Sequence, residues 1–137
     1  MSKDIERELR ALQTYRQHTG KDYVPRSAPD DPASMQDYAM LGVIGSYGDS
    51  WSRPSMDLKT KSFISMTVTA TLGCEDQLRQ HILAAHHTGI TKDEVVDWLI
   101  HLNSYIGTPR TNAAFNVVRS AWAIMRETKN AEPNSQT

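Results

Sequence analysis

The chain contains 137 residues, of which 39% are hydrophobic and 23% charged, so we expect one domain that buries its own core. Its formal net charge is −1, with acids and bases interspersed, which excludes the basic surface that nucleic acids require. One cysteine cannot form an internal disulfide, and no signal peptide or membrane-spanning run is found, so we expect a cytoplasmic protein.

Two helices are predicted in the N-terminal part of the chain. The first spans residues 2–19, which are rich in good helix formers and are followed by glycine. Three prolines make residues 23–32 a loop. A second helix begins at Asp31 and Pro32, which suit an N-cap and a first helical position, and runs to about Tyr47.

A third helix is predicted between Asp57, which can cap it, and Gly73, which stops it. Residues 66–72 also alternate strictly between apolar and polar types, so a strand is the competing interpretation. The flanking aspartate and glycine favour the helix. Because this helix is apolar on nearly all sides, we expect another subunit to cover part of it.

Three more helices are predicted from apolar stripes and capping residues. They cover residues 75–88, residues up to about 106 after a capping box of Thr91 and Glu94, and a stretch that begins with Thr108 as N-cap and Pro109. Residues 130–137 lack a large apolar side chain, so a disordered tail is expected after a domain of residues 1–129. The sequence therefore predicts an all-α fold of about six helices.

The main candidates for chemistry are Cys74, Gln77 and His81, whose spacing of three and four residues places them on one helix face. His81 is either a buried structural histidine or a general acid or base, since imidazole exchanges protons near neutral pH. Gln77 can orient the ring or a substrate. Cys74 is either a small packed residue or a reactive thiolate, which the helix dipole favours and the adjacent Glu75 and Asp76 oppose.

A second candidate region follows the second helix and contains Trp51 and Arg53. Arg53 can bind a carboxylate through its planar guanidinium, and Trp51 can wall a ligand pocket; the alternative for Arg53 is a surface salt bridge. His86, His87 and His101 lack the spacing of a metal site, so no metal is expected. No nucleotide-binding or nucleophile motif is found, so no cofactor is expected.

Five short motifs also follow one another in a specific order. They are Tyr47-Gly-Asp-Ser-Trp-Ser-Arg-Pro54, Leu58-Lys-Thr-Lys-Ser62, Leu78-Arg-Gln-His81, Gly89-Ile-Thr-Lys-Asp-Glu94 and Tyr105-Ile-Gly-Thr-Pro109 with Asn112-Ala-Ala-Phe115. From about Tyr23 to Trp122 they resemble the decarboxylase branch of the carboxymuconolactone decarboxylase family. The resemblance implies an all-α fold related to alkyl hydroperoxidase D, assembled as a homo-oligomer, a trimer or a hexamer, with pockets near subunit contacts.

The resemblance also implies an activity. The chain would be a cofactor-independent lyase that decarboxylates a small carboxylated lactone or ring compound in the breakdown of aromatic compounds. His81 would deliver a proton to carbon, and Arg53 would position a carboxylate or stabilise developing charge. The residues expected to contact the substrate are Gln77, Trp51, Tyr47, Cys74 and Tyr105.

The chain departs from both branches of that family. Where the hydroperoxidase branch has a second cysteine and a glutamate, this chain has Gln77 and Ser62. Where the decarboxylase branch usually has tryptophan, glutamate and arginine, it has Tyr47, Gln77 and Leu83. Two other functions stay open: a thiol-dependent, peroxide-reducing protein in which Cys74 works with an external thiol, and a non-catalytic ligand-binding oligomer.

Overall fold

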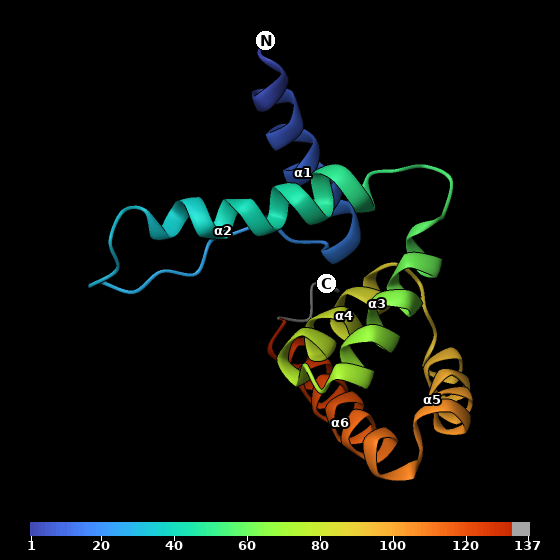
Figure 1. Ribbon diagram of the computed structural model, residues 1–137. Helices are drawn as coiled ribbons and strands as arrows, with labels where there is room; N and C mark the ends of the chain where they lie inside the picture. Colours follow the sequence, from blue (N-terminus) through green and yellow to red (C-terminus); the bar gives the residue numbers. More distant parts are fainter. Residues whose placement is uncertain (133–137) are drawn as a thin grey trace, which may run out of the picture. The chain divides into compact units, whose positions relative to one another are not determined.

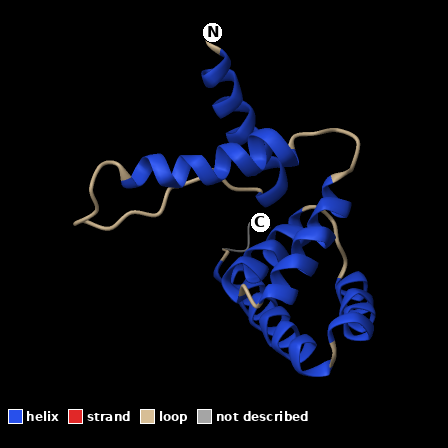
Figure 2. Ribbon diagram, in the orientation of Figure 1, coloured by secondary structure: helices blue, strands red, loops and turns tan. Residues whose placement is uncertain are grey.

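The computed structural model describes residues 1–132 of the chain (Figure 1). Every regular element in this range is a helix, and no strand occurs in it (Figure 2). The all-α prediction is therefore confirmed. The chain divides into two compact units, Met1–Lys61 and Ser62–Thr137, here called unit 1 and unit 2.

Unit 1 is built from three helical elements. They are α1 (Lys3–Thr19), α2 (Met35–Val43) and the π-helix η1 (Ile44–Trp51). The predicted first helix is confirmed: the Ser2 hydroxyl accepts a hydrogen bond from the backbone N–H of Ile5 at 3.3 Å, and Gly20 ends the helix with φ 75°. Arg7 pairs with Asp49 across α1 and η1, with 2.8 Å between Nε and Oδ1.

The second helix differs from its prediction at both ends. The regular α-helix begins at Met35 rather than at Pro32, because the Met35 N–H donates to the Pro32 carbonyl at 2.9 Å in a tighter turn. The Asp31 carboxylate does not cap this helix; it accepts from the Ala28 N–H at 2.7 Å and closes the preceding turn. At the other end the chain stays helical past Tyr47, as the π-helix η1.

Close packing of η1 against α1 depends on Gly48. A Cβ atom at this position would lie 3.1 Å from the Arg7 carbonyl oxygen and 3.2 Å from the Ala11 Cβ, so a larger residue would push the two elements apart. The Gly48 carbonyl accepts from Arg10 Nε at 2.9 Å and from the Ser52 hydroxyl at 2.8 Å. The π-helix is thus held by side chains as well as by its own backbone.

A buried lysine binds the chain where η1 ends. The Lys61 ammonium donates to the carbonyls of Ser50 at 3.1 Å and Trp51 at 3.0 Å, and also to that of Arg53. Only 8% of Lys61 is exposed. A positive charge at the C-terminal end of a helix satisfies carbonyls that have no partner inside the helix and complements the helix dipole.

Four helices follow in the rest of the chain. They are α3 (Leu58–Leu72), within which the boundary between the units lies, α4 (Glu75–His87), α5 (Lys92–Ile106) and α6 (Thr108–Ala131). Asp57 accepts from the Thr60 N–H at 2.8 Å and caps α3, as predicted. The strand considered for residues 66–72 is absent, because this segment is the end of α3. The capping box of Thr91 and Glu94 is confirmed, with both bonds at 3.1 Å.

The sixth helix begins and ends differently from its prediction. Its N-cap is Gly107, so Thr108 is already helical and does not cap the helix. At the other end α6 continues through Ala131, beyond the expected domain end at residue 129. Residues 133–137 of the expected tail lie outside the described residues. A single domain over residues 1–129 stays a prediction.

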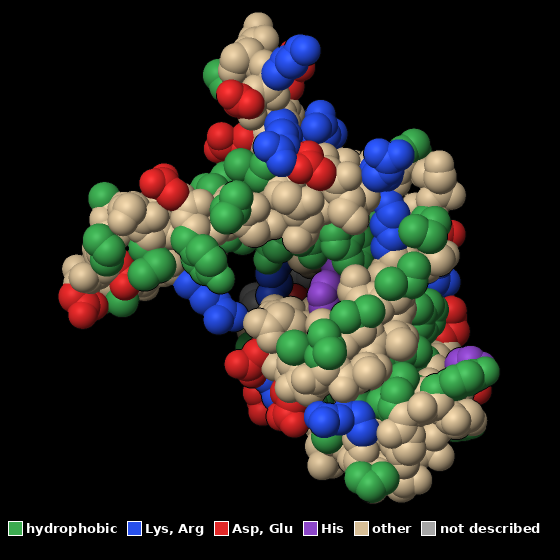
Figure 3. All heavy atoms as spheres, viewed as in Figure 1, with side chains coloured by type: hydrophobic (Ala, Val, Ile, Leu, Met, Phe, Trp, Pro, Cys, Tyr) green, Lys and Arg blue, Asp and Glu red, His purple; other side chains and the backbone are tan. Residues whose placement is uncertain are grey.

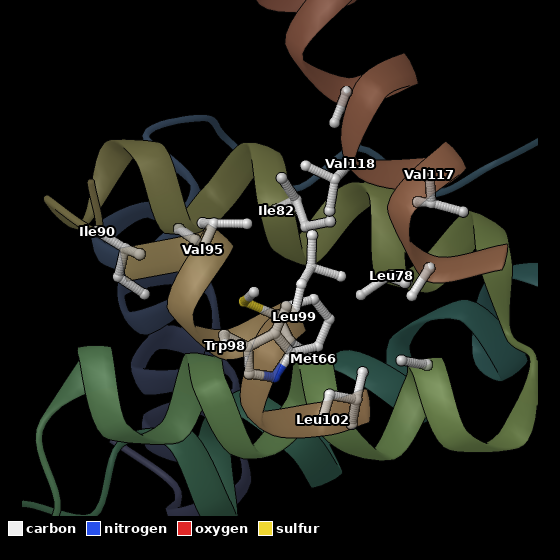
Figure 4. Packing of buried hydrophobic residues seen from close by; sticks show 14 residues of the cluster. Met66, Leu78, Ile82, Ile90, Val95, Trp98, Leu99, Leu102, Val117 and Val118 are labelled. Carbon is white, nitrogen blue, oxygen red and sulfur yellow. The ribbon is translucent and has the colours of Figure 1, made fainter. Parts of the chain in front are cut away.

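The core of unit 2 is formed by side chains from all four of these helices (Figure 4). Met66 from α3 is fully buried, and Leu78 and Ile82 from α4 meet Val118 from α6 with 1% of each exposed. Outside this core, hydrophobic side chains remain on the surface (Figure 3). No helix within residues 1–132 is long and apolar enough to cross a membrane.

Candidate functional site

The face predicted from Cys74, Gln77 and His81 begins at the N-terminus of α4 and is here called the α4 face. Cys74 is the N-cap residue: its N–H donates to the Thr69 carbonyl at 2.8 Å, and its own carbonyl accepts from the Leu78 N–H at 2.9 Å. Cys74 and His81 are half-buried, and Gln77 is exposed. Gln77 and His81 thus lie one turn apart on α4, and Cys74 stands directly before the helix as its N-cap residue.

His81 sits beside the core of unit 2. Its neighbours in the chain, Leu78 and Ile82, belong to the buried cluster and fix this side of α4 against the core. Burial lowers the pKa of His81 below its usual value of 6.5, because the charged imidazolium loses hydration. The imidazole is therefore mainly neutral at neutral pH, and its protonated form is a stronger acid than an exposed histidine. These properties suit proton transfer.

A cation that the sequence analysis did not consider lies at the start of the α4 face. Gly73 has φ 74° in the turn between α3 and α4, and a Cβ there would lie 2.6 Å from Nη1 of Arg110 in α6. The guanidinium of Arg110 therefore covers the turn directly before Cys74. The only signal in the sequence was an arginine inside the Tyr105–Phe115 motif region, directly after Pro109.

Tyr47 and Trp51 come together on η1. Their rings are stacked with centroids 5.4 Å apart at an interplanar angle of 15°. His18 from α1 touches both: Nδ1 and the Tyr47 hydroxyl are 2.9 Å apart, and the imidazole stacks on the Trp51 indole with centroids 4.0 Å apart. Tyr15 closes the group edge-on to Tyr47 at 5.1 Å. We call these four residues the η1 aromatic cluster.

The Tyr47 phenol is neutral at neutral pH, and its surroundings in the cluster raise its pKa further. Burial is the main cause that raises the pKa of Tyr47, with a smaller contribution from Tyr15, so the hydroxyl retains its proton and can donate a hydrogen bond. His18 was not predicted from the sequence. Its signal was a helical spacing, because Ala11, Thr14 and His18 are all buried on one face of α1.

The remaining predicted residues are more exposed. Arg53 follows η1, and its side chain is exposed while its carbonyl accepts from Lys61. Tyr105 near the end of α5 is 77% exposed, with its ring 5.2 Å from that of His101. The predicted site residues thus form two groups. Those in unit 1 are Tyr47, Trp51 and Arg53, and those in unit 2 are Cys74, Gln77, His81 and Tyr105.

An apolar pocket of about 600 Å³ lies between α3 and α5 in unit 2. Its lining residues are Phe63, Ile64, Thr67, Val68, Glu94, Asp97, Trp98 and His101. Trp98 is fixed there by a hydrogen bond from Nε1 to the Thr67 hydroxyl at 3.0 Å. None of the residues predicted for the site lines this pocket. Within residues 1–132 no three histidine, cysteine or acidic side chains gather as metal ligands.

Comparison with known proteins identifies a family and a relative of similar length. The sequence model described as "Carboxymuconolactone decarboxylase family" matches residues 43–120. A protein of Acinetobacter baylyi named 4-carboxymuconolactone decarboxylase is 31% identical over 119 residues, which are 87% of this chain and 89% of that protein. The segment matched by the family model includes η1 and the α4 face, whereas α1 with His18 precedes it.

Proposed function

The chain belongs to the carboxymuconolactone decarboxylase family, and we propose that it is a cofactor-independent carboxy-lyase acting on a small carboxylated lactone or ring compound. The relative of similar length is named for the decarboxylation of 4-carboxymuconolactone. The observation that carries the proposal is His81, a half-buried imidazole of lowered pKa on the face of α4 within the matched region.

An unsaturated lactone supplies its own electron sink, so this decarboxylation needs no cofactor. The bond between the ring carbon and the carboxylate carbon breaks, its electron pair moves into the conjugated lactone, and CO2 leaves. His81 in its protonated form then donates a proton to carbon and regains one from solvent. Burial makes that imidazolium a stronger acid, which favours the transfer.

The other site residues have supporting roles in this proposal. The exposed guanidinium of Arg53 binds a carboxylate of the incoming substrate or stabilises enolate-like charge. Gln77, one turn before His81, orients the substrate by hydrogen bonding. The residues that contact the ring are Tyr47, Trp51, Cys74 and Tyr105.

We also propose that the enzyme is a homo-oligomer, a trimer or a hexamer. The row Ile64, Val68 and Leu72 on α3 supports this, because these side chains are 47%, 49% and 70% exposed and follow one another at intervals of four residues. A row of this kind on one helix suits contact with another subunit. Sedimentation of the purified protein tests the assembly.

The test of the activity uses γ-carboxymuconolactone generated enzymatically and follows the loss of its absorbance. We expect turnover by the purified protein, a loss of about 10²–10⁴-fold in kcat for His81→Gln, and little change for His87→Gln, an exposed histidine of the same helix. Because only the imidazolium donates, kcat/KM falls as the pH rises through the pKa of His81, which lies below 6.5. Full activity of His81→Gln would remove the proposed proton donor.

The same purified protein distinguishes the lyase from the two alternative functions. A peroxide-reducing protein would lose its free Cys74 thiol on exposure to hydrogen peroxide, and Cys74→Ser would abolish peroxide consumption in the presence of an external thiol. A non-catalytic protein would bind the lactone without consuming it. Lactone turnover that survives in Cys74→Ser supports the lyase against both.

A further inference from the structure

His18 is a fully buried polar side chain in the last turn of α1. A buried imidazole costs folding free energy unless its polar atoms are bonded, so an apolar residue would be the simpler filler at this position. It contacts two residues of η1: the Tyr47 hydroxyl at 2.9 Å from Nδ1, and the Trp51 ring at 4.0 Å between centroids. His18 is thus the side chain that joins α1 to both rings.

The two contacts restrain different motions. The hydrogen bond fixes the position of the Tyr47 hydroxyl oxygen, and therefore the direction in which the side chain points. The stack, at an interplanar angle of 27°, fixes the plane of the Trp51 indole. Tyr15 packs edge-on against the Tyr47 ring at 76° and opposes its rotation. The Tyr47 phenol is neutral at neutral pH and can donate to His18.

We propose that His18 is a positioning residue that sets substrate affinity: it holds Tyr47 and Trp51 in the orientation in which they contact the substrate. The inference rests on the proposed function, in which both rings contact the substrate. Since His18 precedes the segment 43–120 that the family model matches, α1 would shape the aromatic part of the site from outside that segment.

The test removes each half of the hydrogen bond separately. His18→Phe keeps a ring that can stack on Trp51 but loses the bond, and Tyr47→Phe removes only the hydroxyl. We expect each variant to raise KM for γ-carboxymuconolactone about tenfold, with kcat changed less than about threefold because His81 is untouched. The double variant should raise KM no further than either single variant, and His18→Asn, whose amide can still bond the phenol, should recover part of the affinity.

Tyr38→Phe is the matched control, because Tyr38 lies on α2 with 76% of its surface exposed. It should leave KM unchanged. Unaltered KM in a folded His18→Phe protein overturns the proposal, and so does an increase in KM for the double variant equal to the product of the two single increases.

A measurement without substrate distinguishes failure of this inference from failure of the proposed function. If the wild type does not turn over the lactone, the proposed function fails for that substrate. The coupling between His18 and Tyr47 is then judged from near-ultraviolet circular dichroism and urea midpoints of the wild type, His18→Phe, Tyr47→Phe and the double variant. Equal loss of aromatic ellipticity in the two single variants and the double variant supports positioning by His18. Additive losses overturn it.

Discussion

Replacing Lys61 with methionine keeps the apolar stem of the side chain and removes its ammonium. In the folded protein that ammonium donates to the carbonyls of Ser50, Trp51 and Arg53, and the lysine is only 8% exposed. The substitution therefore removes one donor from each of three carbonyls near the end of η1, of which that of Ser50 still accepts from the Arg53 N–H at 3.1 Å. It tests whether this charge stabilises the segment that carries Trp51 and Arg53.

The magnitude follows from how many of these carbonyls water can reach. A hydrogen bond from a charged donor contributes about 1.5–3 kcal/mol, so three would give at most about 9 kcal/mol. Ser50 and Arg53 are exposed residues whose carbonyls can rehydrate, whereas Trp51 is buried. Removing a buried charge also returns part of its desolvation cost. We therefore expect Lys61→Met to lower the free energy of unfolding by about 2–4 kcal/mol.

Urea denaturation at a fixed protein concentration measures this loss. With a slope near 2 kcal/mol per molar urea, the midpoint should fall by about 1–2 M, followed by far-ultraviolet circular dichroism and tryptophan fluorescence. Lys21→Met, at an exposed position of the same unit, should shift the midpoint by less than about 0.3 M. Equal shifts for the two variants would refute a stabilising role for the Lys61 ammonium.

Two further predictions concern the region around the α4 face. Because burial lowers the pKa of His81, the unfolded chain binds a proton more readily than the folded chain. The contribution of this group to stability is therefore present above pH 6.5 and is lost as the pH falls through the folded-state pKa. Urea midpoints measured from pH 8 to pH 5 should fall more steeply for the wild type than for His81→Gln. Gly73→Ala should lower the free energy of unfolding by at least about 1–2 kcal/mol, because φ is 74° and the new Cβ would meet Arg110. In an Arg110→Ala background, the loss should fall to that of the backbone strain alone. The same loss in both backgrounds, measured by thermal or urea denaturation, would exclude the clash.

Where local chemistry sets the helix ends, the sequence was sufficient to predict them. Ser2, Asp57 and the pair Thr91 and Glu94 make the capping bonds expected of their residue types. The choice of helix over strand for residues 66–72 was also correct, because the capping aspartate and the terminal glycine outweighed the alternation of threonine with apolar residues. Signals of this kind act within a few residues of the chain.

The elements that differ depend on contacts that helix propensity does not include, one within a local turn and one between distant segments. Asp31 has the residue type of an N-cap, but the turn at Ala28 offers its carboxylate a nearer donor. The π-helix depends on Gly48 lying against α1, with the Arg10 side chain bonded to its carbonyl. Neither contact can be read from helix propensities, because the first depends on the local turn before the helix and the second on the tertiary structure.

The candidate site likewise has residues that local spacing predicts and residues that only distant contacts reveal. Spacing alone places Gln77 and His81 one turn apart on α4, because the geometry of an α-helix is fixed. His18 was missed because its role depends on η1, which lies about thirty residues later in the chain. Arg110 was missed for the same reason, since its neighbour Gly73 belongs to the turn between α3 and α4.

The π-helix η1 also bears on how this segment can vary in length. A π-turn accommodates an extra residue relative to an α-turn, so deleting one residue from Ile44–Trp51 could restore regular α-helix without unravelling it. Because the extra residue is taken up within its own turn, the deletion would change which residues occupy that turn while the helix beyond it keeps its direction. A different side chain would then meet His18. A single codon gained or lost here could exchange the residues facing α1 while the helix itself survives.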